Sequence, residues 1–151
     1  MLNGINKILT GDMLKVLSDM GHDDVLILAD ANFPAESIAK STIHGKPIRC
    51  PGGNVAQVFE AIEPIFPVDV EYSSIPIAVM DLTDSDKARG MARPEAWTDF
   101  ERILHRRYPT TSLGLIERFA FYERARKAYA VFQTGEERQY GNLLLVKGVV
   151  R

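Results

Sequence analysis

The stretch GHDDVLILADANFPA, Gly21–Ala35, decides how the rest of the chain is interpreted. Its centre, Val25–Ala29, is a run of five apolar residues without alternation. Such a run is typical of a strand that is buried on both faces of a parallel or mixed sheet. His22 precedes the run and Asp30 follows it directly. The stretch therefore predicts an internal strand with a proton-transfer group near one end and a carboxylate at the other.

Helical and extended patterns alternate on both sides of this strand. Thr10 or Asp12 is expected to cap the first helix, Gly21 to end it as a C′ glycine, and Asn54 to cap a second helix. We expect helices at 13–20, 55–62, 94–104 and 119–128, a short one after Pro34, and strands at 75–82, 112–118, 129–135 and 142–148. Residues 44–53 and 83–95 read as loops, and the last two strands read as a hairpin joined by residues 136–140. The pattern predicts an α/β fold with a central mixed β-sheet flanked by helices.

The composition is that of an ordinary globular protein. The 151 residues are 46% hydrophobic and 25% charged, which suits one domain over 1–151 with a full core. A net charge of −2 gives no basic field for nucleic acid or an anionic membrane. The first residues lack a secretory signal pattern, and Cys50 is the single cysteine, so no internal disulfide is expected. We expect a cytoplasmic protein without nucleic-acid or membrane partners.

Several weaker motifs favour structural over functional interpretations. The turn PGGN before the second helix has backbone N–H groups for an anion, but two glycines there are more often a plain turn. Cys50 fits a small apolar role better than that of a nucleophile. His44 and His105 have no partner at metal-ligand spacing. The sequence contains neither a P-loop nor GxGxxG after a strand.

A metal site around the opening stretch is an alternative interpretation of these residues. His22, Asp23, Asp24 and Asp30 are residue types that bind divalent cations. Their spacing matches no standard site, so no metal is expected.

Three long motifs resemble one known family. They are MGHDDVLILADANFPA at 20–35, RFAFYERARKAYAV at 118–131 and TGEERQYGNLLLVKG at 134–148. Together they are similar to the L-fucose mutarotases and D-ribose pyranases over nearly the whole chain. The resemblance implies that the protein interconverts the anomers of a free reducing sugar without a cofactor. It also implies a homo-oligomer, since many members form a decamer built from rings, with sites near subunit boundaries.

Two details resemble the fucose branch more than the ribose branch. Members of the ribose branch carry histidine where this chain has Arg118, and Tyr-Ala-Asn where it has Tyr-Gly-Asn at 140–142. Residues 78–90 and 97–104 also resemble the longer middle region of animal-type fucose mutarotases. A D-ribose pyranase and a monosaccharide-binding protein without turnover remain the alternatives. Retention of His22, Asp30, Tyr122 and the Tyr-Gly-Asn motif at 140–142 argues against the second.

The resemblance also assigns roles to individual residues. It makes His22 the proton donor, Tyr122 a further catalytic candidate, and Asp30, Arg118, Tyr140, Gly141 and Asn142 the sugar-binding residues. The residue types suit the reaction, because the reference pKa of histidine, about 6.5, lies near neutral pH and a carboxylate accepts hydrogen bonds from two hydroxyls. From the residues alone, His22 also fits a favourable cation near a helix end, and Tyr122 fits the core.

The spacing of His22 and Asp30 sets a geometric problem. A five-residue strand is roughly 16 Å long at about 3.3 Å per residue, which exceeds the size of a monosaccharide. Both side chains meet one sugar only if the flanking loops curl inward or if neighbouring subunits share the site. We expect the shared site, with the inward fold of a loop as the alternative.

Overall fold

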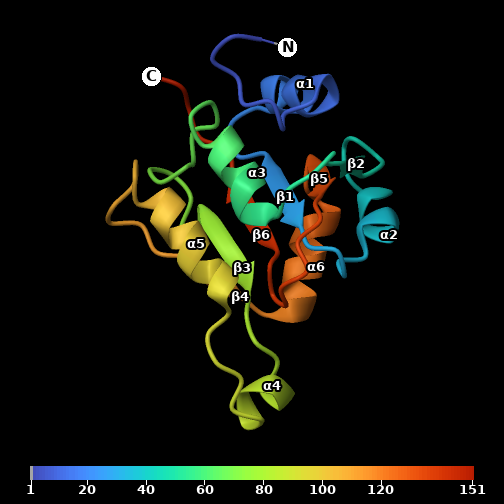
Figure 1. Cartoon of the computed structure of the whole chain (residues 1–151), viewed down its shortest axis with the longest axis vertical. Coiled ribbons are helices and arrows are strands. Elements are labelled where there is room, and N and C mark those ends of the chain that lie inside the picture. The colour runs from blue at the N-terminus through green and yellow to red at the C-terminus, as the bar shows by residue number, and fades with distance from the viewer. Residues whose placement is uncertain (1) are drawn as a thin grey trace.

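The structure, a computed structural model, describes residues 2–151 and is organised around one six-stranded sheet (Figure 1). The strands are β1 Val25–Ala29, β2 Ile48–Arg49, β3 Ile77–Met80, β4 Gly114–Ile116, β5 Ala130–Gln133 and β6 Leu143–Val146. The helices are α1 Gly11–Asp19, α2 Ala35–Ala39, α3 Val55–Ile62, α4 Asp84–Ala88, α5 Glu95–Leu104 and α6 Arg118–Arg126. The predicted α/β fold with a mixed central sheet is confirmed.

The strand order is β2-β5-β1-β6-β3-β4. β1 pairs in parallel with β5 and antiparallel with β6, and β6 pairs antiparallel with β3. With β2 parallel to β5 and β4 parallel to β3, five strands share one direction and β6 alone runs against them. The carboxyl ends of the five parallel strands therefore lie at one edge of the sheet, beside the beginning of β6.

β1 is covered on both faces, as its continuous apolar run predicts. Leu26 and Leu28 pack in the cluster formed with α1, α3 and α5, whereas Ile27 and Ala29 pack in the cluster formed with α2 and α6. Figure 1 shows α3 and α5 on one side of the sheet and α2 and α6 on the other, with α1 at the upper end of the view and α4 standing away from the sheet at the lower end. Burial of consecutive side chains on alternate faces is the reason that no polar residue interrupts the run.

The helix caps follow the sequence at both predicted starts. Thr10 caps α1 by accepting from the Met13 N–H, and Asn54 forms a reciprocal capping box with Gln57 at α3. That box uses the Asn54 N–H at the end of the PGGN turn, which agrees with a structural role for that residue. Gly21 does follow the C-cap residue Met20, as predicted, but Met20 is extended and Gly21 does not have the positive φ typical of a C′ glycine.

The end of α1 is closed by a lysine instead. The ammonium of Lys147 donates to the carbonyls of Leu17 and Met20 at 2.7 and 2.5 Å, so the helix needs no left-handed glycine. The positive φ in this turn falls on Asp23, at 70°.

Three other local predictions are wrong. β5 and β6 form no hairpin, because β1 lies between them. Ile48 and Arg49, predicted as loop, form the short edge strand β2 beside β5. The segment 83–95 contains α4, which Thr83 caps by accepting from the Asp86 N–H. Within residues 2–151, no helix is long and apolar enough to cross a membrane.

Candidate active site

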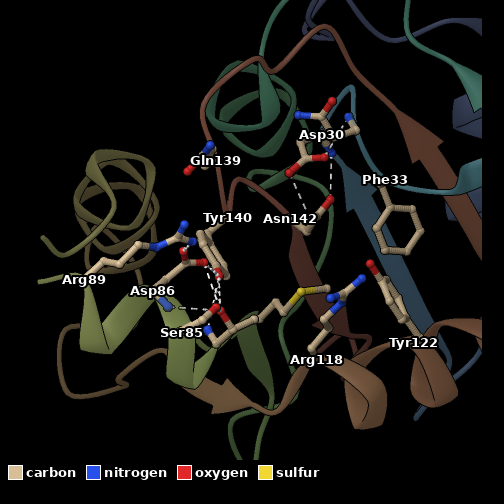
Figure 2. A pocket seen from close by; sticks show the side chains of 13 residues that line it. Asp30, Phe33, Ser85, Asp86, Arg89, Arg118, Tyr122, Gln139, Tyr140 and Asn142 are labelled. Carbon is tan, nitrogen blue, oxygen red and sulfur yellow. Dashed lines mark hydrogen bonds and ion pairs between the residues drawn. The ribbon is translucent and has the colours of Figure 1, made fainter. Parts of the chain in front are cut away.

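A polar cavity of about 410 Å³ lies at the edge where the parallel strands end (Figure 2). Segments that follow β1, β3, β4 and β5 all contribute to its wall, as is usual for ligand sites in α/β sheets. The lining residues are Asp30, Asn32, Phe33, Met80, Thr83, Ser85, Asp86, Arg89, Arg118, Tyr122, Gln139, Tyr140 and Asn142. Five of the seven predicted site residues are in this set, and Gly141 lies between two of them.

Asp30 and Asn142 form the buried end of the cavity. The Asp30 N–H donates to Asn142 Oδ1 at 2.8 Å, and Asn142 Nδ2 donates to Asp30 Oδ2 at 3.0 Å. The other carboxylate oxygen accepts the Asn32 N–H at 3.0 Å. Both residues are buried, with 4% of Asp30 and 5% of Asn142 exposed. The carboxylate is therefore fixed in orientation before any ligand binds.

Burial raises the pKa of the Asp30 carboxyl above its ordinary value. The N–H groups of Asn32, Phe33 and Gly141 act in the opposite direction, because they stabilise the charged form. Desolvation is the larger of the two effects. A carboxylate held in this way is a strong acceptor for sugar hydroxyls, which would return some of its lost solvation.

An ion-pair network shapes the loop that carries Tyr140, Gly141 and Asn142. Arg138 binds both oxygens of the buried Glu136 at 2.8 and 2.9 Å and also reaches Asp99 at 2.8 Å. The Glu136 carbonyl accepts the Ala31 N–H at 2.8 Å, which ties this loop to the segment after β1. A side chain on Gly141 would lie 2.6 Å from Glu136 Cγ, so glycine is required by this packing. The loop is thus built around one buried glutamate.

Arg118 and Tyr122 form the opposite wall, where α6 begins (Figure 2). They are four residues apart and so share one face of the helix. The Arg118 guanidinium lies over the ring of Tyr122 at 5.8 Å, and Phe33 contacts the same ring edge-on at 5.7 Å. The tyrosine is thereby oriented toward the cavity rather than buried in the core. The core interpretation applies instead to Phe121, which is fully buried.

Tyr140 connects the motif loop to the segment that follows β3. Its φ is 59°, its hydroxyl donates to Asp86 and accepts the Thr83 N–H at 3.1 Å, and its carbonyl accepts the Trp97 Nε1–H at 3.0 Å. Hydrogen bonds from Tyr140 and Arg89 lower the pKa of Asp86. Tyr140 therefore lines the cavity and also holds the segment 83–89 in place through these hydrogen bonds.

Sequence reasoning missed that whole segment. Thr83, Ser85, Asp86 and Arg89 line the cavity, although residues 83–95 read as a surface loop. Their polar composition has no apolar periodicity that would point inward. The one available signal was position, because the segment directly follows a buried strand, as Asp30 does.

His22 lies away from the cavity. It precedes β1, whereas Asp30 follows it, so the strand separates them. The inward fold of a loop, which would bring both to one cavity, is absent. His22 Nε2 lies 3.2 Å from Asp69 Oδ2, its ring meets Tyr72 edge-on at 5.3 Å, and its side chain is 44% exposed. The structure brings six predicted residues together and leaves the predicted proton donor outside.

The carboxylates do not form a metal cluster. Asp30 and Asp86 are the two acidic residues that line the cavity, and across residues 2–151 no group of three potential ligands is assembled. Cys50 packs against the core, and burial raises the pKa of its thiol to about 11, which disfavours the nucleophilic thiolate. The chemistry available in the cavity is hydrogen bonding and proton transfer by carboxylate, guanidinium, amide and phenol groups.

Comparisons with known proteins give consistent matches over nearly the whole chain. The model of the RbsD / FucU transport protein family matches residues 3–150. Human fucose mutarotase is 46% identical over 149 residues, which are 99% of this chain and 94% of the human protein. The crystal structure of the fucose mutarotase from Streptococcus pneumoniae, in complex with L-fucose, is similar with a TM-score of 0.84 and 35% identity, over 99% of this chain and 100% of that one.

A more distant structure shares the fold. RbsD from Bacillus subtilis, complexed with D-ribose, has a TM-score of 0.69 and 21% identity, over 97% of this chain and 98% of that one. The family model and relatives above 40% identity both match nearly the full length of the chain, so the family assignment is unambiguous. The chain belongs to the RbsD / FucU family.

Proposed function

We propose that the protein is a mutarotase that interconverts the α and β anomers of L-fucose or a closely similar free aldose. The observation that carries the proposal is the cavity itself, which joins a fixed, buried Asp30 to Arg118 and Tyr122 in a space suited to one monosaccharide. The similarity to mutarotases of fucose, extending over the full chain, selects this activity and this sugar.

The reaction needs little beyond placed acid–base groups. A proton leaves the anomeric hydroxyl and another is delivered to the ring oxygen, the bond between C1 and the ring oxygen breaks, and an open aldehyde forms. Reclosure on the other face of C1 gives the other anomer, with no electron or group transferred. Each placed acid or base contributes roughly 10²–10⁴-fold, so one or two suffice.

Within one chain, the cavity supplies binding groups and two phenols, those of Tyr122 and Tyr140. Asp30 and Asn142 accept and donate to sugar hydroxyls, and the Arg118 fork donates to them. The Tyr122 hydroxyl can both donate and accept, whereas the Tyr140 hydroxyl is already bonded to Asp86 and Thr83. His22, the proposed proton donor, would have to come from another copy of the chain.

We therefore infer a homo-oligomer in which His22 of one subunit completes the cavity of its neighbour. The support is geometric, since β1 spans roughly 16 Å between the two residues by the usual strand rise. The His22 side chain is 44% exposed, which leaves it open to such a contact. We propose that this oligomer is a decamer built from rings. It would act in the cytoplasm on free sugar and would need no cofactor.

Two alternative functions are separable by one measurement. A D-ribose pyranase would use the same chemistry with another pocket, and a binding protein would have the cavity without turnover. Saturation-transfer NMR on free sugars detects exchange between anomers directly. Faster exchange with L-fucose than with ribose supports the proposal. Faster exchange with ribose alone indicates the pyranase. If no sugar shows faster exchange, the protein is a binding protein.

A further inference from the structure

We propose that Asp86 is a positioning residue that determines which sugars are accepted. It binds the hydrogen of the Tyr140 hydroxyl, so that this hydroxyl can only accept, and the sugar must donate to it from a free hydroxyl group. The proposal deepens the function above and rests on it, because it takes the cavity as a sugar site.

Asp86, Arg89 and Tyr140 meet on one side of the cavity. Figure 2 shows them across from Phe33 and Tyr122, with dashed lines that mark their hydrogen bonds. The Asp86 side chain is 21% exposed, and α4, which carries it, buries no residue. Polar contacts rather than apolar packing therefore hold this helix beside the cavity.

The carboxylate of Asp86 accepts hydrogen bonds on both oxygens. Oδ1 accepts from the Arg89 guanidinium, and Oδ2 accepts from the Thr83 hydroxyl at 3.0 Å and from the Tyr140 hydroxyl. Hydrogen bonds from Tyr140, Arg89 and Thr83, in order of size, lower the pKa of Asp86. The carboxyl group is therefore ionised at neutral pH and has no hydrogen of its own to donate.

The hydrogen-bonding capacity of the Tyr140 hydroxyl is thereby largely used. A phenol has one hydrogen to donate and lone pairs to accept, and the oxygen of Tyr140 already accepts the Thr83 N–H at 3.1 Å. Thr83 Oγ1, at 3.4 Å, is a more distant and uncharged acceptor, so the hydrogen stays on the Asp86 carboxylate. Toward the cavity, the hydroxyl can only accept one more hydrogen bond.

The backbone keeps the Tyr140 ring from turning away. Its φ is 59°, and its carbonyl accepts the Trp97 Nε1–H at 3.0 Å. The phenol oxygen is held in one place, and the sugar group that meets it must supply a hydrogen. A hydroxyl does so, whereas hydrogen, fluorine or an ether oxygen does not. Such a site rejects the analogue that lacks the hydroxyl, because the polar group of the protein is left unpaired.

Paired analogues of L-fucose test this polarity. Fluorine accepts a weak hydrogen bond but cannot donate one, and hydrogen does neither. Deoxy and deoxyfluoro sugars altered at C2, C3 or C4 are titrated by NMR to obtain Kd. The position that meets Tyr140 is the one whose deoxy analogue binds more weakly than L-fucose in the parent but not in Tyr140→Phe. There, both analogues should bind the parent at least about fivefold more weakly than L-fucose, and the deoxyfluoro sugar no more tightly than the deoxy sugar.

Asp86→Asn should reverse this polarity. Arg89 keeps the amide oxygen, so the amide nitrogen faces Tyr140 and donates to it, and the phenol hydrogen turns toward the cavity. The deoxyfluoro sugar should then bind at least about threefold more tightly than the deoxy sugar. Asp86→Ala removes the acceptor altogether and should shift the ratio in the same direction. Damage to the structure alone would weaken both analogues alike and leave their ratio unchanged.

Asp84→Asn is the matched control, because it neutralises an exposed carboxylate on the same helix that does not line the cavity. Its ratio of the two Kd values should equal that of the parent. A ratio that is the same in the parent, Asp86→Asn and Asp86→Ala would refute the role of Asp86, as would the lack of any position that meets the Tyr140→Phe criterion. The proposed function stands in both cases if the parent exchanges the anomers of L-fucose. If the parent neither binds nor exchanges a sugar, both proposals fall.

Discussion

Asp30 and Asn142 exchange two hydrogen bonds although 112 positions separate them in the chain. The register explains the meeting: Leu28 of β1 pairs with Leu143 of antiparallel β6, so the residues just beyond each strand face one another. Asn142 holds both the backbone and the side chain of Asp30. The carboxylate is consequently oriented by an amide that is itself part of the cavity wall.

Asn142→Ala should therefore affect both stability and activity. The variant leaves the Asp30 N–H and one carboxylate oxygen without partners in a buried place, which costs about 1–3 kcal/mol of unfolding free energy. Anomer exchange should fall at least about tenfold, because the carboxylate loses its fixed orientation. Urea unfolding and saturation-transfer NMR measure the two effects.

The control is Asn54→Ala, which removes the capping box of α3 and costs about 1 kcal/mol. It lies outside the cavity, so exchange should stay within twofold of the parent. Equal losses of activity in the two variants would mean that Asn142 acts through stability alone.

The raised pKa of Asp30 predicts a pH-dependent stability. Burial raises this pKa above its ordinary value of 3.8, so the native state holds the proton more tightly than the unfolded chain does. Stability from this group is present below pH 3.8 and is lost as pH rises through the raised native value. The unfolding free energy of the parent should fall relative to that of Asp30→Asn as pH rises above 3.8. Urea unfolding of both proteins at several pH values measures the difference, and a difference that is constant or grows with pH would contradict it.

Gly141→Ala should displace the motif loop. A Cβ there would lie 2.6 Å from Glu136 Cγ and 3.0 Å from the Arg138 carbonyl, so either the buried ion pair or the backbone must shift. We expect a loss of about 1–3 kcal/mol and weaker sugar binding, because Asn142 follows directly. Gly11→Ala has no atom within 4 Å of its added methyl and should leave both unchanged. Calorimetric melting and sugar titration distinguish the variants.

The sequence predicted most of the sheet because β1, β3 and β6 are short apolar runs with one possible role. It failed at β2, whose two residues have no pattern, and at the expected hairpin. The polar loop 136–140 has the composition of a tight hairpin turn. In the structure it is held by the ion pair between Arg138 and Glu136, and the strands that it joins, β5 and β6, pair on either side of β1. Pairing between distant segments is decided by the packing of both faces of β1, which no local window contains.

The site was predictable where motif and position agreed. Asp30 follows a buried strand, and the family resemblance named the residues at 140–142. Asp86 and Thr83 were hidden in a segment of surface composition, and their contact with Tyr140 depends on where α4 stands. Nothing in the sequence indicated that Asp69 lies beside His22, because the two segments meet only at the end of β6.

Arg118 should determine which sugar is accepted. Its planar fork lies at the cavity wall over Tyr122, and histidine there would be shorter and uncharged at neutral pH. Arg118→His should lower exchange of L-fucose at least about tenfold and shift the preference toward ribose. Arg126→His, on the same helix but paired with Glu123 outside the cavity, should keep the parental preference. Saturation-transfer NMR across a panel of sugars decides the point, and an unchanged preference in Arg118→His would remove the residue from substrate selection.

The shared site makes a prediction about mixed oligomers. His22→Ala and Asp30→Ala should each be inactive, because each removes one group from every site. If the two side chains of a site come from different subunits, a mixture that exchanges subunits contains interfaces where an intact His22 meets an intact Asp30. About a quarter of the sites are then complete in an equal, random mixture, since each position is intact in half of the subunits, and activity returns in that proportion.

The control is the same mixture under conditions that block subunit exchange, which should stay inactive. Mass spectrometry of isotope-labelled subunits confirms exchange in the first sample. A folded single subunit should also be inactive, because β1 holds its own His22 away from its own cavity. Mixed oligomers that form but remain at the level of the separate variants would show that one chain supplies both groups. That result would require a rearrangement of the turn at 21–24 upon sugar binding, in place of a neighbour's histidine.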